Sequence, residues 1–152
     1  MKHTLLLIGI GIGLLSCGTA SVSTQTVERT IQYNKSDNLT AASEGTITFT
    51  GIEDSRCPEG AQCIWAGNAT VDLELKSPKA TASETQRVKM CLGDCNTLYP
   101  QAGFKETDTK EVTLAGIRYK FTLEEVNPYP SVNKPISGKE AYSIKVKIEE
   151  AL

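Results

Sequence analysis

Histidine is almost absent from this chain of 152 residues. The only one, His3, lies in the apolar leader at the start of the sequence. Serine and cysteine nucleophiles need an imidazole to move a proton, and most catalytic zinc sites need histidine ligands. Because the rest of the chain has no imidazole, the sequence excludes Ser-His-Asp and Cys-His catalysis and the H-E-x-x-H metalloproteases.

An excess of positive charge and a glycine-rich phosphate loop are also missing. The chain has 16 Lys and Arg against 18 Asp and Glu, whereas a nucleic-acid-binding domain carries a basic patch. We therefore expect no nucleic-acid partner, no cofactor and no metal. Carboxylates remain for acid–base chemistry, but the adjacent pairs Glu124-Glu125 and Glu149-Glu150 should point to opposite faces of a strand. They are predicted to be solvated surface charges.

The start of the chain has the pattern of a secretory signal peptide. Lys2 precedes the apolar run Leu5–Leu15, and small residues follow. This run is shorter than the roughly 20 residues that a membrane-spanning helix needs. We therefore expect residues 1–16 to be removed on export.

The sequence Leu14-Leu15-Ser16-Cys17 resembles the lipobox of bacterial lipoproteins. The resemblance implies cleavage before Cys17 and attachment of a diacylglycerol to its thiol. Stable membrane anchoring takes two signals, and a lipoprotein cysteine with two or three acyl chains meets that need. Residues 17–25 are then a lipid-anchored tether and residues 26–152 a single β domain, in the bacterial cell envelope, facing the periplasm or the cell exterior.

Four other cysteines predict two disulfides, because an even number in an exported chain is typical of a disulfide framework. Three pairings are open. Turn residues inside each short loop favour two local bonds, whereas crossed pairs would close loops of about 35 residues. Free thiols and a four-cysteine zinc site are the alternatives, and the spacings are looser than those of zinc ribbons. The residues are Cys57, Cys63, Cys91 and Cys95.

Apolar and polar residues alternate along most of the remaining chain, which predicts strands with one buried face. Four segments alternate clearly (46–50, 69–76, 117–124 and 142–149) and three more weakly (27–33, 86–92 and 110–114). No segment after the leader has a convincing helical period. The fold class is therefore all-β, an antiparallel two-sheet sandwich of about seven strands of the immunoglobulin-like type. A small β-barrel is the alternative.

The densest motif is D-S-R-C-P-E-G-A-Q-C-I-W-A-G, residues 54–67. It is similar to a segment of small exported bacterial lipoproteins of unknown function. These proteins share roughly D-S-R-C-P, a short spacer, C-x-W-A-G and a following alternating strand. The resemblance covers about a fifth of the chain after the leader, and it implies export and a β fold but no activity.

Four residues form the candidate binding loop. Trp65 is expected to pack as a core or rim anchor beside a disulfide, and its alternative is an exposed recognition side chain. Asp54 and Arg56 are expected to form a local ion pair or to bind backbone donors of the loop. Tyr129, between two prolines, is either an exposed loop aromatic or a plug over one end of the sandwich.

The function that these features favour is a lipid-anchored envelope protein with a non-catalytic binding or scaffold role. Its expected partners are the membrane, through the acyl chains on Cys17, and an envelope protein or small ligand. A carboxylate-based hydrolase is one alternative. The other is a secreted protease-inhibitor-like module that offers a disulfide loop, for which Arg56 is the candidate contact.

Overall fold

The computed structural model describes residues 25–41, 45–77 and 84–151. The expected signal peptide of residues 1–16, the lipidation site Cys17 and residues 18–24 of the expected tether lie outside this part of the chain. Lipid anchoring therefore stays a prediction.

Strands make up most of the described chain. Each of the seven segments expected from alternation coincides closely with one strand, and two short strands, β2 and β6, join them. The strands are β1 Gln25–Gln32, β2 Ser36–Asn38, β3 Thr46–Asp54, β4 Asn68–Lys76, β5 Thr85–Asp94, β6 Phe104–Lys105, β7 Asp108–Leu114, β8 Ile117–Asn127 and β9 Ser143–Ala151. A short 3-10 helix, η1, spans Lys139–Ala141.

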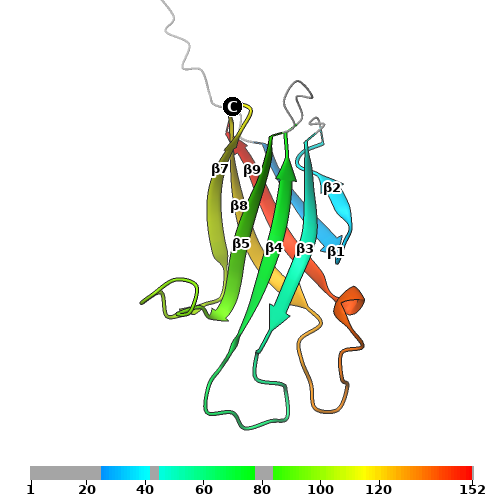
Figure 1. Cartoon of the computed structure of the whole chain (residues 1–152), viewed down its shortest axis with the longest axis vertical. Coiled ribbons are helices and arrows are strands. Elements are labelled where there is room, and N and C mark those ends of the chain that lie inside the picture. The colour runs from blue at the N-terminus through cyan, green and yellow to red at the C-terminus, as the bar shows by residue number, and fades with distance from the viewer. Residues whose placement is uncertain (1–24, 42–44, 78–83, 152) are drawn as a thin grey trace, which may run out of the picture.

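The strands form two antiparallel sheets that pack face to face (Figure 1). One sheet has the order β1-β9-β8-β7 and the other β2-β3-β4-β5-β6. No strand pairing joins the two sheets in the described residues, so the fold is a sandwich and not a closed barrel. The expected two-sheet sandwich is confirmed.

The connectivity is a meander. β2 to β6 follow one another across the five-stranded sheet. In the four-stranded sheet β7 to β9 follow one another, and β1 pairs with β9. Immunoglobulin domains instead pass strands between the sheets in Greek-key order. The likeness to that type therefore extends to the two layers and not to the strand order.

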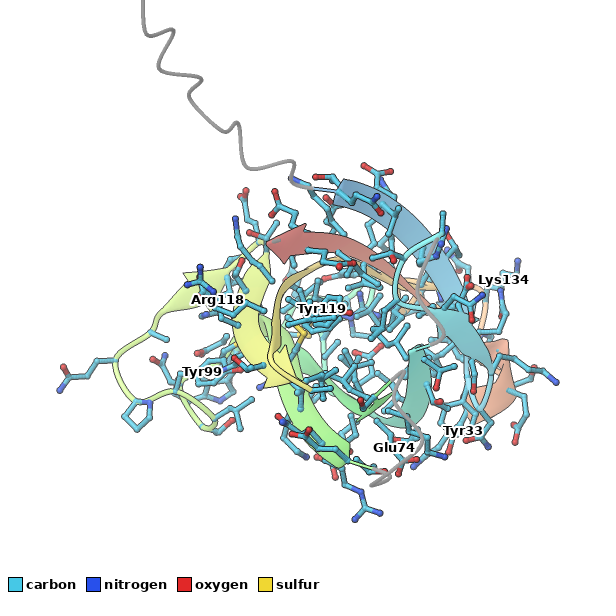
Figure 2. All side chains as sticks on the ribbon, turned by 90° about the horizontal axis from the view of Figure 1, so that it is seen from above. Tyr33, Glu74, Tyr99, Arg118, Tyr119 and Lys134 are labelled. Atoms are coloured by element: carbon cyan, nitrogen blue, oxygen red, sulfur yellow. A yellow bond between two sulfur atoms is a disulfide. The ribbon has the colours of Figure 1, made fainter. Side chains whose placement is uncertain are left out.

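One contiguous core fills the space between the sheets. It is built by the inward residues of the alternating strands, such as Phe49 in β3, Leu73 in β4, Phe121 in β8 and Val146 in β9, all at most 1% exposed. Full burial of a side chain of this kind stabilises the fold by about 1.5–3 kcal/mol. Figure 2 shows Tyr119 among these interior side chains.

A bulge in β8 changes the alternation between Leu123 and Glu125. Leu123 and Val126 are both buried, and the two residues between them are not. Glu124 and Glu125 therefore both lie outside the core. The expectation that they point to opposite faces is wrong, because a bulge adds one unpaired residue to the strand. Glu149 and Glu150 keep the regular alternation, and Glu150 is buried, so the expectation that it is a solvated surface charge is wrong.

The two ends of the sandwich differ. Gln25 pairs with Glu150 at one end, and β7 turns into β8 at the same end. Three long loops leave at the opposite end (Figure 1): the first loop, residues 55–67; the second loop, residues 95–107, which includes β6; and the third loop, residues 128–142. We call these three segments together the loop end. Strands of about nine residues separate the two ends by roughly 30 Å.

Candidate binding surface at the loop end

A buried ion pair begins the first loop. The Arg56 Nε and Nη2 donate to the two carboxylate oxygens of Asp54 at 2.9 and 2.6 Å. Their side chains are only 8% and 3% exposed. The backbone N–H of Arg56 also donates to Asp54 Oδ1 at 3.1 Å. The expected local role of these two residues is confirmed.

Arg56 also ties the first loop to the third. Its Nη1 donates to the carbonyl oxygen of Val126 at 2.8 Å, and its Nη2 donates to that of Pro128 at 3.1 Å. The guanidinium carbon lies 4.5 Å from the centroid of the Tyr129 ring. Three of the four residues of the predicted binding loop are thus brought together, namely Asp54, Arg56 and Tyr129.

Tyr142, at the end of the third loop, completes this anchor. Its hydroxyl donates to Asp54 Oδ2 at 3.1 Å. Burial, followed by the nearby Asp54 charge, raises the pKa of Tyr142 to about 12. The hydroxyl therefore stays protonated and able to donate at neutral pH.

The first disulfide closes the first loop on itself. Cys57 and Cys63 are bonded with their Cα atoms 5.9 Å apart, as the turn residues between them favour. The N–H of Cys57 donates to the carbonyl of Ala66 at 2.9 Å. Glu59 then pairs with the third loop, because its N–H donates to Pro130 and its carbonyl accepts from Val132. The two loops form one connected surface.

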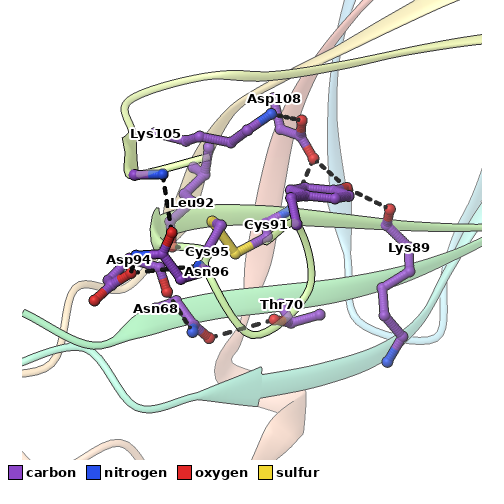
Figure 3. Close-up of a disulfide and its surroundings, with 12 residues drawn as sticks. Asn68, Thr70, Lys89, Cys91, Leu92, Asp94, Cys95, Asn96, Lys105 and Asp108 are labelled. Carbon is purple, nitrogen blue, oxygen red and sulfur yellow. Dashed lines mark hydrogen bonds and ion pairs between the residues drawn. A yellow bond between two sulfur atoms is a disulfide. The ribbon is translucent and has the colours of Figure 1, made fainter. Parts of the chain in front are cut away.

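The second disulfide, Cys91–Cys95, holds the start of the second loop (Figure 3). Asp108 joins this region to β7, because Oδ2 accepts from the N–H of Cys91 at 3.0 Å and from the Tyr99 hydroxyl at 2.7 Å. The Lys105 Nζ donates to Oδ1 at 2.6 Å. Burial, with the Asp108 hydrogen bond second, raises the pKa of Tyr99. Both expected local disulfides are present.

The loop end carries every large hydrophobic side chain that is exposed in the described residues. They come from all three loops: Ile64 (91% exposed), Trp65 (77%), Phe104 (66%), Val132 (53%) and Tyr129 (47%). The expectation that Trp65 packs as a core or rim anchor is wrong. The loop that carries Trp65 is held instead by the Cys57–Cys63 bond and by the hydrogen bonds of Arg56 to the third loop, while Trp65 itself is in water.

Sequence reasoning found Trp65 and Tyr129 but missed Ile64, Phe104 and Val132. Only the position of these three residues in the sequence could have indicated that they are exposed. Each is an apolar residue next to a turn or a cysteine, in a segment without strand alternation. Whether such a residue is buried or exposed is decided by contacts with distant parts of the chain.

A groove opens beside this apolar surface. It has a volume of about 530 Å³ and lies between the second loop, the end of β8, and the first and last residues of the first loop. Phe104 and Tyr129 line it together with the buried Leu92 and Val126. An aromatic-lined groove with a few polar groups is typical of a recognition site.

Two further observations bear on function. No three His, Cys, Asp or Glu side chains come together as metal ligands anywhere in residues 25–41, 45–77 and 84–151. In the same residues, no helix is long and apolar enough to cross a membrane.

No protein-family model, curated protein or solved structure matches this chain at a significant level. The likeness of residues 54–67 to exported lipoproteins therefore stays a prediction, and the function rests on the chemistry of the loop end itself.

Proposed function

We propose that this protein is a lipid-anchored, non-catalytic binding protein of the bacterial cell envelope, and that the loop end is its recognition surface. One observation carries the proposal: all five exposed large hydrophobic side chains of the described residues lie on the three loops. Single apolar residues scattered over a surface are ordinary, whereas a concentration of them marks an interaction site. Tryptophan and tyrosine are also enriched where binding energy concentrates.

The rigidity of the loops supports this role. The first loop is held by Cys57–Cys63 and Arg56, and the second by Cys91–Cys95 and Asp108. Binding by a surface that is already fixed avoids the cost of ordering loops on association. The apolar side chains are thus presented on a scaffold prepared for contact.

The direction of the chain supports it as well. Gln25 enters the sandwich at the end opposite the loops. A lipid on Cys17 would hold that end within about 28 Å of the bilayer, the greatest reach of eight residues. The loop end would then face away from the membrane, toward other envelope components. Two disulfides fit an oxidising, non-cytoplasmic environment.

The alternatives lack such support. A protease-inhibitor-like module would have to offer Arg56 to a protease, but this side chain is buried and hydrogen-bonded to two loop carbonyls. A carboxylate-based hydrolase would need a carboxylic acid that burial keeps protonated, to act as the general acid. Three carboxylates line the groove at the loop end, but Glu106 and Glu125 are both exposed, and Glu124 pairs with Lys145 at 3.2 Å.

Anchoring is tested by replacing Cys17 with alanine and fractionating the cells. We expect the wild-type protein to pellet with membranes and to show an added acyl mass, and the variant to lose both. If the variant stays in the membrane fraction at an unchanged mass, the lipoprotein proposal is wrong.

Recognition by the loop end is tested by site-specific photo-crosslinking in living cells. A benzophenone amino acid is placed at position 65 or 104, and at position 111, an exposed site on β7, as the matched control. We expect discrete cross-linked products from 65 and 104 and none from 111. Absence of products from the loop positions, or the same products from all three, refutes the proposal.

A further inference from the structure

The groove beside the exposed apolar surface has a particular balance of charge. Its two basic residues are already engaged, because Arg56 binds Asp54 and Lys105 binds Asp108, each at 2.6 Å. Neither cation is therefore available to a ligand as a free positive charge.

Two carboxylates on the groove have no such neutralisation. Glu106 and Glu125 line it, and neither forms an ion pair within the part of the chain that the structure describes. Glu125 accepts a hydrogen bond from the Asn127 amide at 2.8 Å, which orients the carboxylate without cancelling its charge. The third acidic residue of the groove, Glu124, is paired with Lys145. The groove thus has an uncompensated negative charge.

Two aromatic residues line the same groove as these carboxylates. Phe104 is 66% exposed and Tyr129 47% exposed, and both line the same groove. Aromatic faces attract cations, and the Tyr129 ring already holds the guanidinium of Arg56 at 4.5 Å. Leu92 and Val126 provide apolar contact deeper in the groove, which suits the aliphatic stem of a long basic side chain.

We propose that this groove receives an arginine or lysine side chain from an extended segment of the protein partner. This inference rests on the proposed function. The carboxylates of Glu106 and Glu125 accept charge-assisted hydrogen bonds from the cationic head. Phe104 and Tyr129 enclose it, while Trp65 and Ile64 contact apolar residues of the same segment. A bilayer fits the site less well, because the carboxylates repel anionic lipid headgroups.

The test compares two fluorescein-labelled peptides, Gly-Ser-Arg-Gly-Arg-Ser-Gly and the same peptide with citrulline in place of each arginine. Citrulline keeps the shape of the side chain and removes its charge. The full chain, purified from bacterial membranes in detergent, is titrated into each peptide and fluorescence anisotropy is recorded. We expect the arginine peptide to bind at least tenfold more tightly than the citrulline peptide.

Two double variants locate the binding. Glu106→Gln with Glu125→Gln should weaken binding of the arginine peptide about tenfold. Glu53→Gln with Glu111→Gln, two exposed carboxylates that do not line the groove, makes the same change in net charge and should leave binding unaltered. Circular dichroism checks that all variants keep the wild-type fold.

Several results would overturn the proposal: equal binding of the two peptides, no binding at millimolar protein, or equal losses in both double variants. The proposal would also be wrong if the protein forms a dimer, or binds phosphatidylglycerol vesicles, and the groove variant abolishes that association. The groove would then receive a second copy of the chain or a bilayer. If the cross-links from positions 65 and 104 persist in that case, the function of the loop end stands and only the identity of its ligand is wrong.

Discussion

The buried pair of Arg56 and Asp54 allows a quantitative test of how the loop end is held. Replacing Arg56 with alanine removes its four side-chain hydrogen bonds, two to Asp54 and one each to the carbonyls of Val126 and Pro128. It leaves the Asp54 carboxylate, only 3% exposed, without its counter-charge. Removing one partner of a buried ion pair destabilises a protein by about 3–5 kcal/mol.

This loss is large against a total stability of about 5–15 kcal/mol for a domain. At roughly 3–5 °C per kcal/mol for a domain of this size, we expect the melting temperature to fall by about 10–20 °C. Urea unfolding followed by far-ultraviolet circular dichroism gives the free energy, and calorimetry gives the melting temperature.

A matched control separates this effect from the loss of any arginine. Arg29 lies 3.6 Å from Asp37, and the two side chains are 24% and 42% exposed. Arg29→Ala should therefore cost less than about 1 kcal/mol. The double variant Asp54→Leu with Arg56→Met should be more stable than Arg56→Ala alone, because it leaves no unpaired charge. If Arg56→Ala costs no more than Arg29→Ala, the pair does not hold the loops and our account of the loop end fails.

Three further predictions follow from the same structure. Trp65→Ala should change the free energy of unfolding in urea by less than about 1 kcal/mol, because the residue is 77% exposed, whereas truncation of a buried tryptophan costs about 3–5 kcal/mol. Replacing both Cys57 and Cys63 with alanine should lower the free energy of unfolding by about 2 kcal/mol, the loop entropy of a seven-residue closure, measured by the same titration. The pKa of Tyr142 is raised from 10 to about 12, so the folded state holds the phenol proton more tightly than the unfolded state does. The stability that this protonated phenol contributes is therefore complete below pH 10 and is lost as the pH rises toward 12. Urea midpoints at pH 9 and pH 11.5 should differ more for the wild type than for Tyr142→Phe, and an equal difference would contradict this assignment.

The strands could be predicted from sequence because alternation follows directly from the geometry of a half-buried strand. Segments such as 69–76 and 117–124 therefore coincide with β4 and β8. β2 and β6 were missed because strands of three and two residues are too short to show a period. The bulge after Leu123 was missed for a related reason, since one extra residue is visible only once the partner strand fixes the register.

The loop end could be predicted only in its local parts. The bond between Cys57 and Cys63 and the pair between Asp54 and Arg56 join residues close in sequence, and turn chemistry or spacing indicates them. The first loop, which carries Trp65, is held by Arg56, and Arg56 binds Val126, which lies 70 residues away in the sequence. No local pattern encodes that contact, so the sequence could not show how the loop lies, and the expected burial of Trp65 was wrong.

Under the proposed function, stability and recognition depend on different residues of this molecule. The loops are held by polar anchors and disulfides: Arg56 for the first and third loops, and Asp108 with Cys91–Cys95 for the second. Their large apolar side chains are consequently not needed to fill a core, and they remain in water. Exposed apolar area contributes little to folding but is favourable to bury against a partner. The polar anchors should therefore govern whether the protein folds, and the apolar side chains should govern what it binds.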